Sequence, residues 1–489
     1  MKNNYIILPF NFARYGEKIL ITNDLGEFQF IDNSIFQAFI SNRLEKTSEP
    51  YQNLETKFFL SSNISEDLIN QYARRYRTKK RFLYEATSLH MIVLTYRCNQ
   101  SCKYCHASSI TQDENSTSDM NLHTAKQVVD FIFSSSTSYI KIEFQGGEPS
   151  LNFDTLKFIL EYATLNKPHN TKLDFVVCTN LYDLKKEHIE LYKQYKVDIS
   201  ISLDGSELLH DSCRINNDGT GTYTKVVNNI NTLRSEGLNN ISALLTVHSK
   251  NINNLRDIID EYIKNNFNSI FIRSINPYGN VLSNQELMNY DMSKFTNKYI
   301  DALNYIIELN KNDIEFVEEY ASMLLSRILS PFSSGFVDLQ SPAGAAISGI
   351  IYDTNGDIFA SDESRMLYRM NGDNEFMLGH VYSNTREDIF NSIKVENMLK
   401  KTIIECLPGC AWCSYQAYCG SDPIRNYASI KKYISFKPED PICKKNKAIF
   451  GFLFECLSKD ENFINDLFAA WITRRSIKEV ALEDTHGRL

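Results

Sequence analysis

The chain has 489 residues, of which 43% are hydrophobic and 23% charged, and its formal net charge at pH 7 is −8. This balance is typical of a globular protein and excludes a disordered one, and the length is enough for two or three domains. The negative charge argues against a broad nucleic-acid interface, and because we find neither an apolar run of about eighteen residues nor a signal-peptide core, we expect a cytoplasmic protein without a membrane span.

Residues 1–85 predict a small module of their own. Two short strands, Lys18–Thr22 and Glu27–Ile31, flank an Asn-Asp-Leu-Gly turn, and a helix over Ser34–Leu44 follows them. This order is typical of a winged-helix-like module. A basic run then covers residues 74–81, which we interpret as a solvated helix end or linker, with a docking patch for an acidic peptide as the alternative.

Between residues 86 and 285, strand-like apolar runs alternate with helix-like segments, which predicts repeated βα units and a parallel sheet. Apolar residues at helical spacing mark the intervening segments, for instance Leu122–Phe133 and Phe153–Leu165. In such folds chemistry collects at the C-terminal ends of the strands, so we expect functional residues there. The six expected strands are Met91–Thr95, Tyr139–Phe144, Leu173–Cys178, Asp198–Leu203, Ile241–Thr246 and Ser269–Ile275.

Directly after the first of these strands, Cys98, Cys102 and Cys105 form a C-x3-C-x2-C run. Three thiolates can hold three irons of a [4Fe-4S] cube and leave the fourth iron open for a ligand, whereas a zinc site would need another ligand from elsewhere. Eleven cysteines in a chain expected to be cytoplasmic favour metal or cluster ligation over disulfides. A zinc site and three buried thiols remain as alternatives here. We interpret Cys178 and Cys456, in apolar surroundings, as packing residues.

Small and polar residues follow the next strands. Gly146, Gly147, Glu148 and Pro149 end a segment whose glycines let the backbone approach a ligand and whose carboxylate can accept a hydrogen bond from a bound amine. The third and fourth strands end in groups suited to ribose hydroxyls, although each alone is also an ordinary turn residue. These groups belong to Thr179, Asn180, Ser200, Ser202 and Asp204.

Composition divides the remainder of the chain into three parts. Residues 286–335 are expected to form a helical linker, residues 336–455 a compact region dense in Gly, Asp and Cys, and residues 456–489 a C-terminal helix or tail. The compact region contains a C-x2-C-x5-C run and one later cysteine, and four such thiolates can close a cluster shell, with zinc as the competing occupant. These cysteines are Cys410, Cys413, Cys419 and Cys443.

Together these motifs resemble the radical SAM superfamily. The first cysteine run, with Tyr104 before its third cysteine, resembles the family's cluster loop, and the Gly-Gly-Glu-Pro segment resembles the motif that holds the methionyl amine of S-adenosylmethionine (SAM). Residues 202–214 resemble a stretch of radical SAM peptide and sulfatase maturases, in which Arg214 would pair with the SAM carboxylate. The resemblance covers nearly the whole chain. It is strongest to the HxsB maturases of His-Xaa-Ser peptide systems, and the segments that carry it are residues 144–148, 178–181, 202–205, 338–344 and 361–366.

The resemblance implies an α/β fold with a partial (β/α)6 TIM-like radical SAM barrel over residues 86–285. It also implies a winged-helix-like peptide-recognition module over residues 1–85, with an N-terminal decoration that only covers the barrel as the alternative. A SPASM-like auxiliary cluster domain is implied over residues 336–455. The implied cofactors are SAM, a SAM-binding [4Fe-4S] cluster on the first three cysteines, and one auxiliary [4Fe-4S] cluster on the four C-terminal cysteines.

The sequence departs from the full SPASM pattern at the inner auxiliary cluster. Where that family has cysteines, this chain has Ser341, Ser361 and Pro423. We therefore expect two clusters and not three. Asp362 occupies the place where related maturases carry a catalytic carboxylate, which makes it the candidate general base, with a structural ion pair to Arg365 as the alternative. Cys406 is a candidate spare ligand, hydrogen-atom donor or structural residue.

By this resemblance we expect a maturase of a ribosomally made precursor peptide. Reductive cleavage of SAM would produce a 5′-deoxyadenosyl radical that abstracts a hydrogen atom from the peptide, and an intramolecular cross-link is favoured because a base such as Asp362 would take up a proton. The alternative, epimerisation at an α-carbon, needs a hydrogen donor such as Cys406 or Cys213. Expected partners are the precursor peptide, a flavodoxin- or ferredoxin-type electron donor and a second maturase. An RNA-modifying radical SAM enzyme and a zinc-binding scaffold are the competing classes.

Overall fold

The computed structural model describes residues 5–111, 118–333 and 335–484, and a large sheet forms its centre. Ten strands make up this sheet in the order β14-β13-β12-β11-β10-β9-β6-β15-β16-β17. The six strands of its central part are β6 (Leu89–Thr95), β9 (Tyr139–Gly146), β10 (Lys172–Thr179), β11 (Asp198–Ser202), β12 (Ile241–Val247) and β13 (Ser269–Ser274). Every neighbouring pair among these six is parallel, which confirms the expected α/β class.

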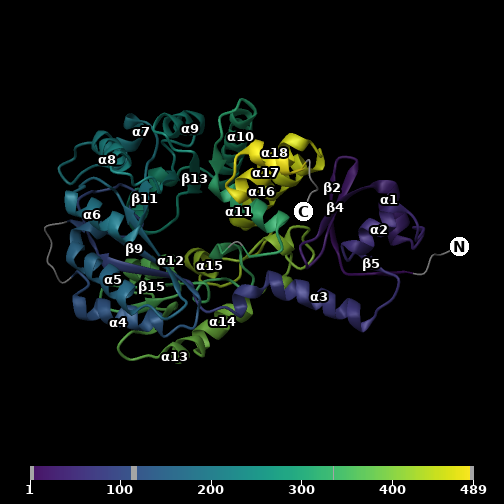
Figure 1. Ribbon diagram of the computed structural model, residues 1–489, viewed down its shortest axis with the longest axis horizontal. Helices are drawn as coiled ribbons and strands as arrows, with labels where there is room; N and C mark the ends of the chain where they lie inside the picture. The colour runs from purple at the N-terminus through teal and green to yellow at the C-terminus, as the bar shows by residue number, and fades with distance from the viewer. Residues whose placement is uncertain (1–4, 112–117, 334, 485–489) are drawn as a thin grey trace.

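Helices between the strands lie on the outer side of the sheet, at the left of Figure 1. Val128, Ile159 and Ile230 on these helices are buried in one core with the strand residues Ile142 and Leu245. Helical periodicity predicted two of these helices to within a residue. The helices are α4 (Leu122–Phe133), α5 (Phe153–Asn166), α6 (Lys186–Tyr195), α7 (Glu207–Asp211), α8 (Tyr223–Ser235) and α9 (Leu255–Lys264).

The C-terminal region continues the same sheet. β15 (Gly349–Tyr352) pairs in parallel with β6, and β16 (Asp357–Phe359) and β17 (Met377–His380) follow as antiparallel neighbours. The turn between β15 and β16 needs Gly356, whose φ is +97° and whose added Cβ would lie 2.7 Å from Val381 Cγ2. The C-terminal region therefore borders β6, the strand that leads into the first cysteine run. At the opposite edge, β14 (Val317–Glu318) pairs with β13.

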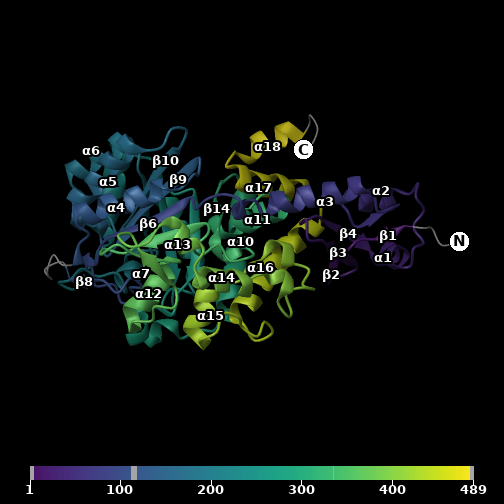
Figure 2. The same cartoon turned by 90° about the horizontal axis from the view of Figure 1, so that it is seen from below.

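More helices follow β13 in the chain, and the last of them, drawn in yellow, lie between this sheet and the N-terminal residues (Figures 1 and 2). They are α10 (Met292–Lys311), α11 (Glu319–Leu329), α12 (Asp362–Asn371), α13 (Arg386–Phe390), α14 (Ile393–Lys401), α15 (Pro423–Ile430), α16 (Pro441–Ser458), α17 (Asn462–Thr473) and α18 (Ile477–Asp484). Part of the expected C-terminal tail, residues 485–489, lies outside the described residues. In the described part of the chain, we find no helix that combines the length and apolarity needed to cross a bilayer.

The N-terminal residues form a small sheet with helices at one end of the molecule, opposite α4 and α5 (Figures 1 and 2). A separate apolar core, which includes Phe39, Leu54 and Phe59, holds these elements together. The antiparallel strands lie in the order β2-β3-β4. The elements are β2 (Asn11–Tyr15), β3 (Lys18–Thr22), β4 (Phe28–Asp32), α1 (Asn33–Ile40), α2 (Glu49–Thr56) and α3 (Glu66–Lys79), with a short ladder between β1 (Ile6–Ile7) and β5 (Leu60–Ser61).

The basic run at the end of α3 is partly buried against the C-terminal region. Lys79 is only 7% exposed and lies 5.1 Å from the ring centre of Tyr418, and burial lowers its pKa to about 7. Lys80 forms an ion pair with Glu405 and donates a hydrogen bond of 2.5 Å to the backbone oxygen of Ser341. The expectation of a solvated helix end is therefore wrong for these two lysines.

Candidate functional site

Backbone hydrogen bonds join the Gly-Gly-Glu turn to the start of the first cysteine run. The Gly147 amide donates to the Thr95 oxygen, and the Glu148 amide donates to the Arg97 oxygen, both at 2.8 Å. A Cβ added to Gly147 would lie 2.2 Å from the Arg97 oxygen, and one added to Gly146 would lie 2.4 Å from the Thr95 oxygen. Both glycines are therefore required because the chain approaches itself closely here, in addition to any approach to a ligand.

The carboxylate of Glu148 links the ends of β9 and β10. It is fully buried and accepts hydrogen bonds from the Thr179 hydroxyl (2.8 Å), the Asn180 amide (2.8 Å) and the Ser150 amide (3.1 Å). Burial raises the pKa of Glu148, and these hydrogen bonds oppose that rise. Pro149 is buried at the start of the short 3-10 helix that follows. The turn is thus a fixed part of the wall beside the cysteine run.

The three thiols of the first cysteine run lie close together. Burial, followed by the neighbouring Cys102, raises the pKa of Cys98 well above its ordinary value, and Cys105 contributes in the same direction. Cys98 Sγ accepts hydrogen bonds from the Gln100 amide at 3.4 Å and from Asn180 Nδ2 at 3.6 Å. These polar hydrogens would also stabilise a thiolate that has released its proton on binding iron.

Arg214 places a positive charge beside these thiols. Its Nε donates to Asp204 Oδ2 at 2.9 Å, its Nη1 lies 3.9 Å from Cys102 Sγ, and its guanidinium lies 5.1 Å from the ring centre of Tyr104. The Tyr104 hydroxyl also donates a hydrogen bond to Asp204.

The Asp204 carboxylate is fully buried, and although burial opposes its charge, Arg214 holds its pKa below the ordinary value. In this conformation Asp204 orients Arg214 and does not face open space.

The chemistry of these donors fits a [4Fe-4S] cluster. No three His, Cys, Asp or Glu side chains in residues 5–111, 118–333 and 335–484 converge as the ligands of a single metal ion do. A cube binds each thiolate through a different iron, so its thiolates stand farther apart than those around one zinc ion. Three neighbouring thiols can supply the three protein ligands of such a cube, and the guanidinium beside them would offset part of its negative charge.

The second group of cysteines forms a similar cluster of thiols on the C-terminal region. Burial raises the pKa of Cys410 to about 12, with Lys437 opposing the rise and Cys419, Cys443 and Cys413 adding to it, so all four thiols are electrostatic neighbours. Cys413 is held one turn after Cys410 by a backbone hydrogen bond of 2.9 Å. Four thiols in one place fit a fully ligated cluster.

A cavity of about 390 Å³ lies between the inner face of the sheet and the C-terminal region. Met91, Gln145, Leu244 and Arg273 line it from the strands. The carboxylates that line it come from three segments of the C-terminal region and belong to Asp338, Asp362, Glu363 and Asp422.

Asp362 is already engaged in this cavity. Arg365 donates to Asp362 Oδ1 from Nε at 3.1 Å and from Nη2 at 2.8 Å, and the guanidinium of Arg365 is almost fully buried. The ion pair considered as the alternative to a general base is therefore present. It does not remove the carboxylate from the cavity, because Asp362 remains on the cavity wall.

Neither candidate hydrogen-atom donor lines the cavity. Cys406 is exposed, and Cys213 is fully buried among apolar residues that include Ile275 and Val281. The packing interpretation of Cys178 is wrong in one respect, because its thiol donates a hydrogen bond of 3.3 Å to Glu143 Oε1.

The ends of β10 and β11 meet beside that thiol. Ser200 stabilises the charged form of Cys178, and Asp362 is among the carboxylates that raise its pKa, after burial and Glu143. Ser202, two residues further along β11, is half-buried. Because side chains alternate along a strand, Ser200 and Ser202 share one face of β11, so that face could have been predicted from the sequence.

Sequence reasoning missed Asp338, Asp422 and Lys445 as groups on the cavity wall. They lie in irregular segments or at helix starts, where no periodic pattern indicates which side chains face inward. The sequence contained one indication of their role: all three lie within residues 336–455, the region in which the cysteines of the inner auxiliary cluster are missing.

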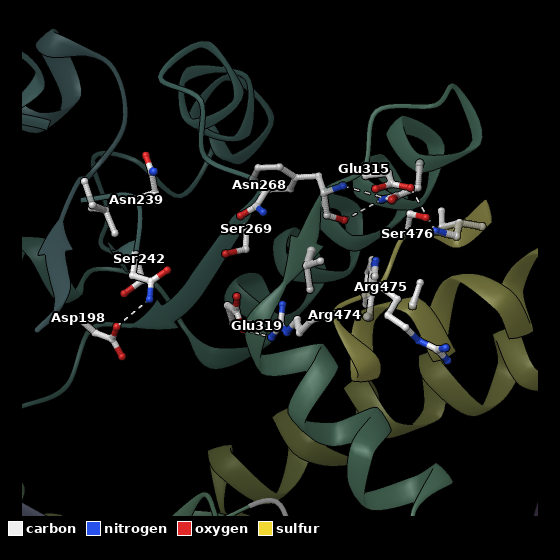
Figure 3. A pocket seen from close by; sticks show the side chains of 18 of the residues that line it. Asp198, Asn239, Ser242, Asn268, Ser269, Glu315, Glu319, Arg474, Arg475 and Ser476 are labelled. Carbon is white, nitrogen blue, oxygen red and sulfur yellow. Dashed lines mark hydrogen bonds and ion pairs between the residues drawn. The ribbon is translucent and has the colours of Figure 1, made fainter. Parts of the chain in front are cut away.

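A second and larger cavity, of about 990 Å³, lies at the N-terminal ends of the central strands (Figure 3). Asp198, Ser242 and Ser269 line it at the starts of β11, β12 and β13, and an ion pair between Glu319 and Arg474 closes one side. None of the predicted site residues lines this cavity. Functional chemistry in parallel α/β folds belongs to the other ends of the strands.

Comparison with known proteins agrees with this geometry. The model of the radical SAM superfamily matches residues 92–262. A cysteine-type anaerobic sulfatase-maturating enzyme of Clostridium novyi is 24% identical over 354 residues, which are 69% of this chain and 88% of that enzyme. The expected resemblance to the superfamily is thereby confirmed, whereas the narrower one to HxsB maturases is not tested.

Two solved structures share the fold. One is native anSMEcpe with bound AdoMet and Cp18Cys peptide, with a TM-score of 0.63, 17% identity and coverage of 76% of this chain and 98% of that one. The other is Streptococcus suis SuiB bound to precursor peptide SuiA, with a TM-score of 0.52, 14% identity and coverage of 90% of this chain and 100% of that one. Residues 92–262 therefore form a radical SAM domain, and the protein is a radical SAM enzyme that uses SAM and [4Fe-4S] chemistry.

Proposed function

We propose that the protein is a maturase that cross-links a ribosomally made precursor peptide. The observation that carries this proposal is the cavity between the strands and the C-terminal region, which has carboxylates on its wall and no thiol. After a hydrogen atom is abstracted, a cross-link requires the peptide to lose one proton, which a base takes up, and one electron, which the auxiliary cluster would take up; epimerisation requires a hydrogen-atom donor instead. The groups on the wall suit the first reaction.

The cofactor sites follow from the same arrangement. Cys98, Cys102 and Cys105 would hold the SAM-binding [4Fe-4S] cluster, and Arg214 would hold the SAM carboxylate through its Nη groups, which do not take part in the hydrogen bond to Asp204. When bound, the cluster and SAM supply the radical that removes a hydrogen atom from the peptide. The auxiliary [4Fe-4S] cluster would be held by the second cysteine group, Cys410, Cys413, Cys419 and Cys443.

The chain's own side chains would perform the remaining steps. The Gly-Gly-Glu turn would fix the SAM amine, with Thr179, Asn180, Ser200 and Ser202 toward the ribose. Enclosure between the sheet and the C-terminal region would exclude water, which protects a reactive radical. Asp362 would accept the proton that the peptide loses, and the two hydrogen bonds from Arg365 would keep that carboxylate oriented.

The remaining parts of the proposal concern the peptide substrate, the partner proteins and the location of the protein in the cell. Peptide-bound structures of the same fold support a peptide substrate, and the motifs quoted above support an HxsB-type system. We infer that residues 1–85 bind the precursor, that a flavodoxin or ferredoxin supplies electrons, and that a second maturase acts in the same system. None of the eleven cysteines, all of which lie in the described part of the chain, forms a disulfide, which suits the reducing cytoplasm.

The test is anaerobic turnover with reduced enzyme, SAM and candidate precursor peptides in D2O, read by mass spectrometry. A cross-link is expected as the loss of two hydrogens from the peptide. Gain of one deuterium without that loss would identify epimerisation instead, and SAM cleavage with no change in any peptide would contradict the maturase proposal.

A further inference from the structure

The second cysteine group reaches the wall of the cavity between the sheet and the C-terminal region. Gly420, the residue after Cys419, lines this cavity. A Cβ added to Gly420 would lie 2.4 Å from the backbone oxygen of Asp338, so only a glycine lets the cysteine loop pack this closely against the cavity wall. The backbone thus brings Cys419 to within one residue of the cavity lining.

Two hydrogen bonds connect the Cys419 thiol with a tyrosine on the same wall. Asn446 Nδ2 donates to Cys419 Sγ at 3.6 Å, and the Tyr320 hydroxyl donates to Asn446 Oδ1 at 3.1 Å. Asn446 and Tyr320 are both buried, and both line the cavity. One side-chain amide therefore joins a ligand of the expected auxiliary cluster to a ring at the cavity surface.

The ring of Tyr320 is held in place by aromatic neighbours. Its centre lies 6.3 Å from that of Phe271 and 6.0 Å from that of Phe336, and both of these residues line the cavity. Burial raises the pKa of Tyr320, and after burial the charge of Cys419 contributes most to that rise. The phenol and the thiol therefore lie close enough to interact electrostatically.

Positive charge also lies beside Cys419. Arg327 is buried and donates from Nε to the Tyr418 oxygen at 2.6 Å; burial lowers its pKa to about 10, and the charge of Cys419 opposes that fall. The Lys445 ammonium, on the cavity wall, lies 4.9 Å from the ring centre of Tyr320. Cations and N–H donors near a cluster sulfur favour the reduced cluster, because it is the more negative state. These surroundings suit a cluster that accepts an electron.

We propose that Asn446 is a positioning residue that connects the auxiliary cluster to the cavity and makes that cluster the acceptor of the electron that the peptide loses. This inference rests on the proposed function, because it assigns a route to the electron that cross-linking releases. The path from the cavity surface to Cys419 is Tyr320 followed by Asn446, and the amide of Asn446 stabilises the reduced cluster through its hydrogen bond to the sulfur.

The atoms and electrons of this step balance. After a hydrogen atom has left one carbon of the peptide, that carbon forms the new bond with a second group of the peptide. The proton of that second group passes to a base on the cavity wall, and the remaining electron passes through Tyr320 and Asn446 to the auxiliary cluster. An oxidised flavodoxin or ferredoxin then takes this electron away, which returns the cluster to its starting state.

The test measures reduction potentials and needs no peptide. Full-length protein with both clusters reconstituted is titrated anaerobically with a reductant in the presence of SAM, and electron paramagnetic resonance spectra are recorded at each potential. SAM changes the spectrum of the cluster that it binds, so the two signals can be separated. The variants are Asn446→Leu, which has a similar size and no N–H donor, and Tyr320→Phe, which removes only the hydroxyl that anchors Asn446. The control is Asn297→Leu, at an exposed position of α10.

In Asn446→Leu we expect reduction of the auxiliary cluster to become about tenfold less favourable, which lowers its potential by about 59 mV, with an unchanged SAM-binding cluster and unchanged iron content. Tyr320→Phe is expected to lower the same potential by a smaller amount, and it tests the proposal if Asn446→Leu does not fold. Asn297→Leu is expected to match the wild type. An unchanged auxiliary potential in both variants, an equal fall for both clusters, or zinc in place of iron on the second cysteine group would each overturn the proposal.

The route of the electron is tested on wild-type enzyme frozen during a single turnover of a peptide that it cross-links. We expect the signal of the reduced auxiliary cluster to appear in these samples. Cross-linking without that signal would overturn this inference and leave the proposed function in place. If no peptide is cross-linked, the proposed function fails, and the potentials measured without peptide still decide the role of Asn446 beside the cluster.

Discussion

Replacement of Gly147 by alanine tests whether the Gly-Gly-Glu turn positions the first cysteine run. The added Cβ would lie 2.2 Å from the Arg97 oxygen and 2.6 Å from the Tyr96 oxygen. Even close carbon-to-oxygen contacts measure about 3.3 Å, so the turn and the cysteine run must separate by about 1 Å. A displacement of about 1 Å at a reacting centre can reduce the rate about a hundredfold.

The assay is the rate of 5′-deoxyadenosine formation by anaerobically reconstituted Gly147→Ala, with iron content and unfolding temperature measured on the same samples. We expect a rate about a hundredfold lower and a stability loss of about 1 to 3 kcal/mol. The control is Gly451→Ala in α16, where the added Cβ meets nothing closer than 3.6 Å. A wild-type rate in Gly147→Ala would refute the argument that this contact holds the two segments in register.

Other predictions use the same preparation. Cys102→Ala is expected to abolish SAM cleavage and to halve the iron content from about eight to about four; retained cleavage would contradict the ligand assignment. Asp362→Asn is expected to stop peptide conversion while 5′-deoxyadenosine still forms, and loss of both activities would instead indicate a structural role. Burial raises the pKa of Glu318 to about 7, so the stability that its protonated form contributes is present below its unfolded pKa and is lost as the pH rises through about 7. Thermal unfolding of Glu318→Gln is expected to depend less on pH between about 5 and 8 than that of the wild type; identical profiles would exclude Glu318 as the cause.

The central α/β part could be predicted because its two periodicities are regular. Every one of the six strands was recognised within two residues at each end, since buried parallel strands are continuous apolar runs bounded by polar turns. The pairing of β15 with β6 could not be predicted, because a four-residue strand carries no register information and its partner lies about 260 residues earlier.

The site shows the same division. The spacing of Cys98, Cys102 and Cys105 was enough to predict a cluster loop, and the resemblance to the family was needed to predict a role for Arg214; the structure brings Arg214 beside Cys102, and the ligand roles stay predictions. The environment of each group was not recognisable. Glu148 was expected to face a ligand, and its carboxylate is occupied by Thr179 and Asn180. Such contacts depend on where three strand ends meet, which no local pattern encodes.

The N-terminal sheet lies directly on the loop that carries the second cysteine group. Thr22 Oγ1 donates to the Ser414 oxygen at 2.8 Å, and the Tyr418 hydroxyl donates to the Gly26 oxygen at 3.1 Å. Binding of a peptide to the sheet and loading of iron onto the loop would therefore act on one shared interface. In the proposed maturase, thermodynamic linkage makes this coupling reciprocal: iron on the loop would change the affinity of the N-terminal sheet for the peptide by the same factor as a bound peptide would change the affinity of the loop for iron.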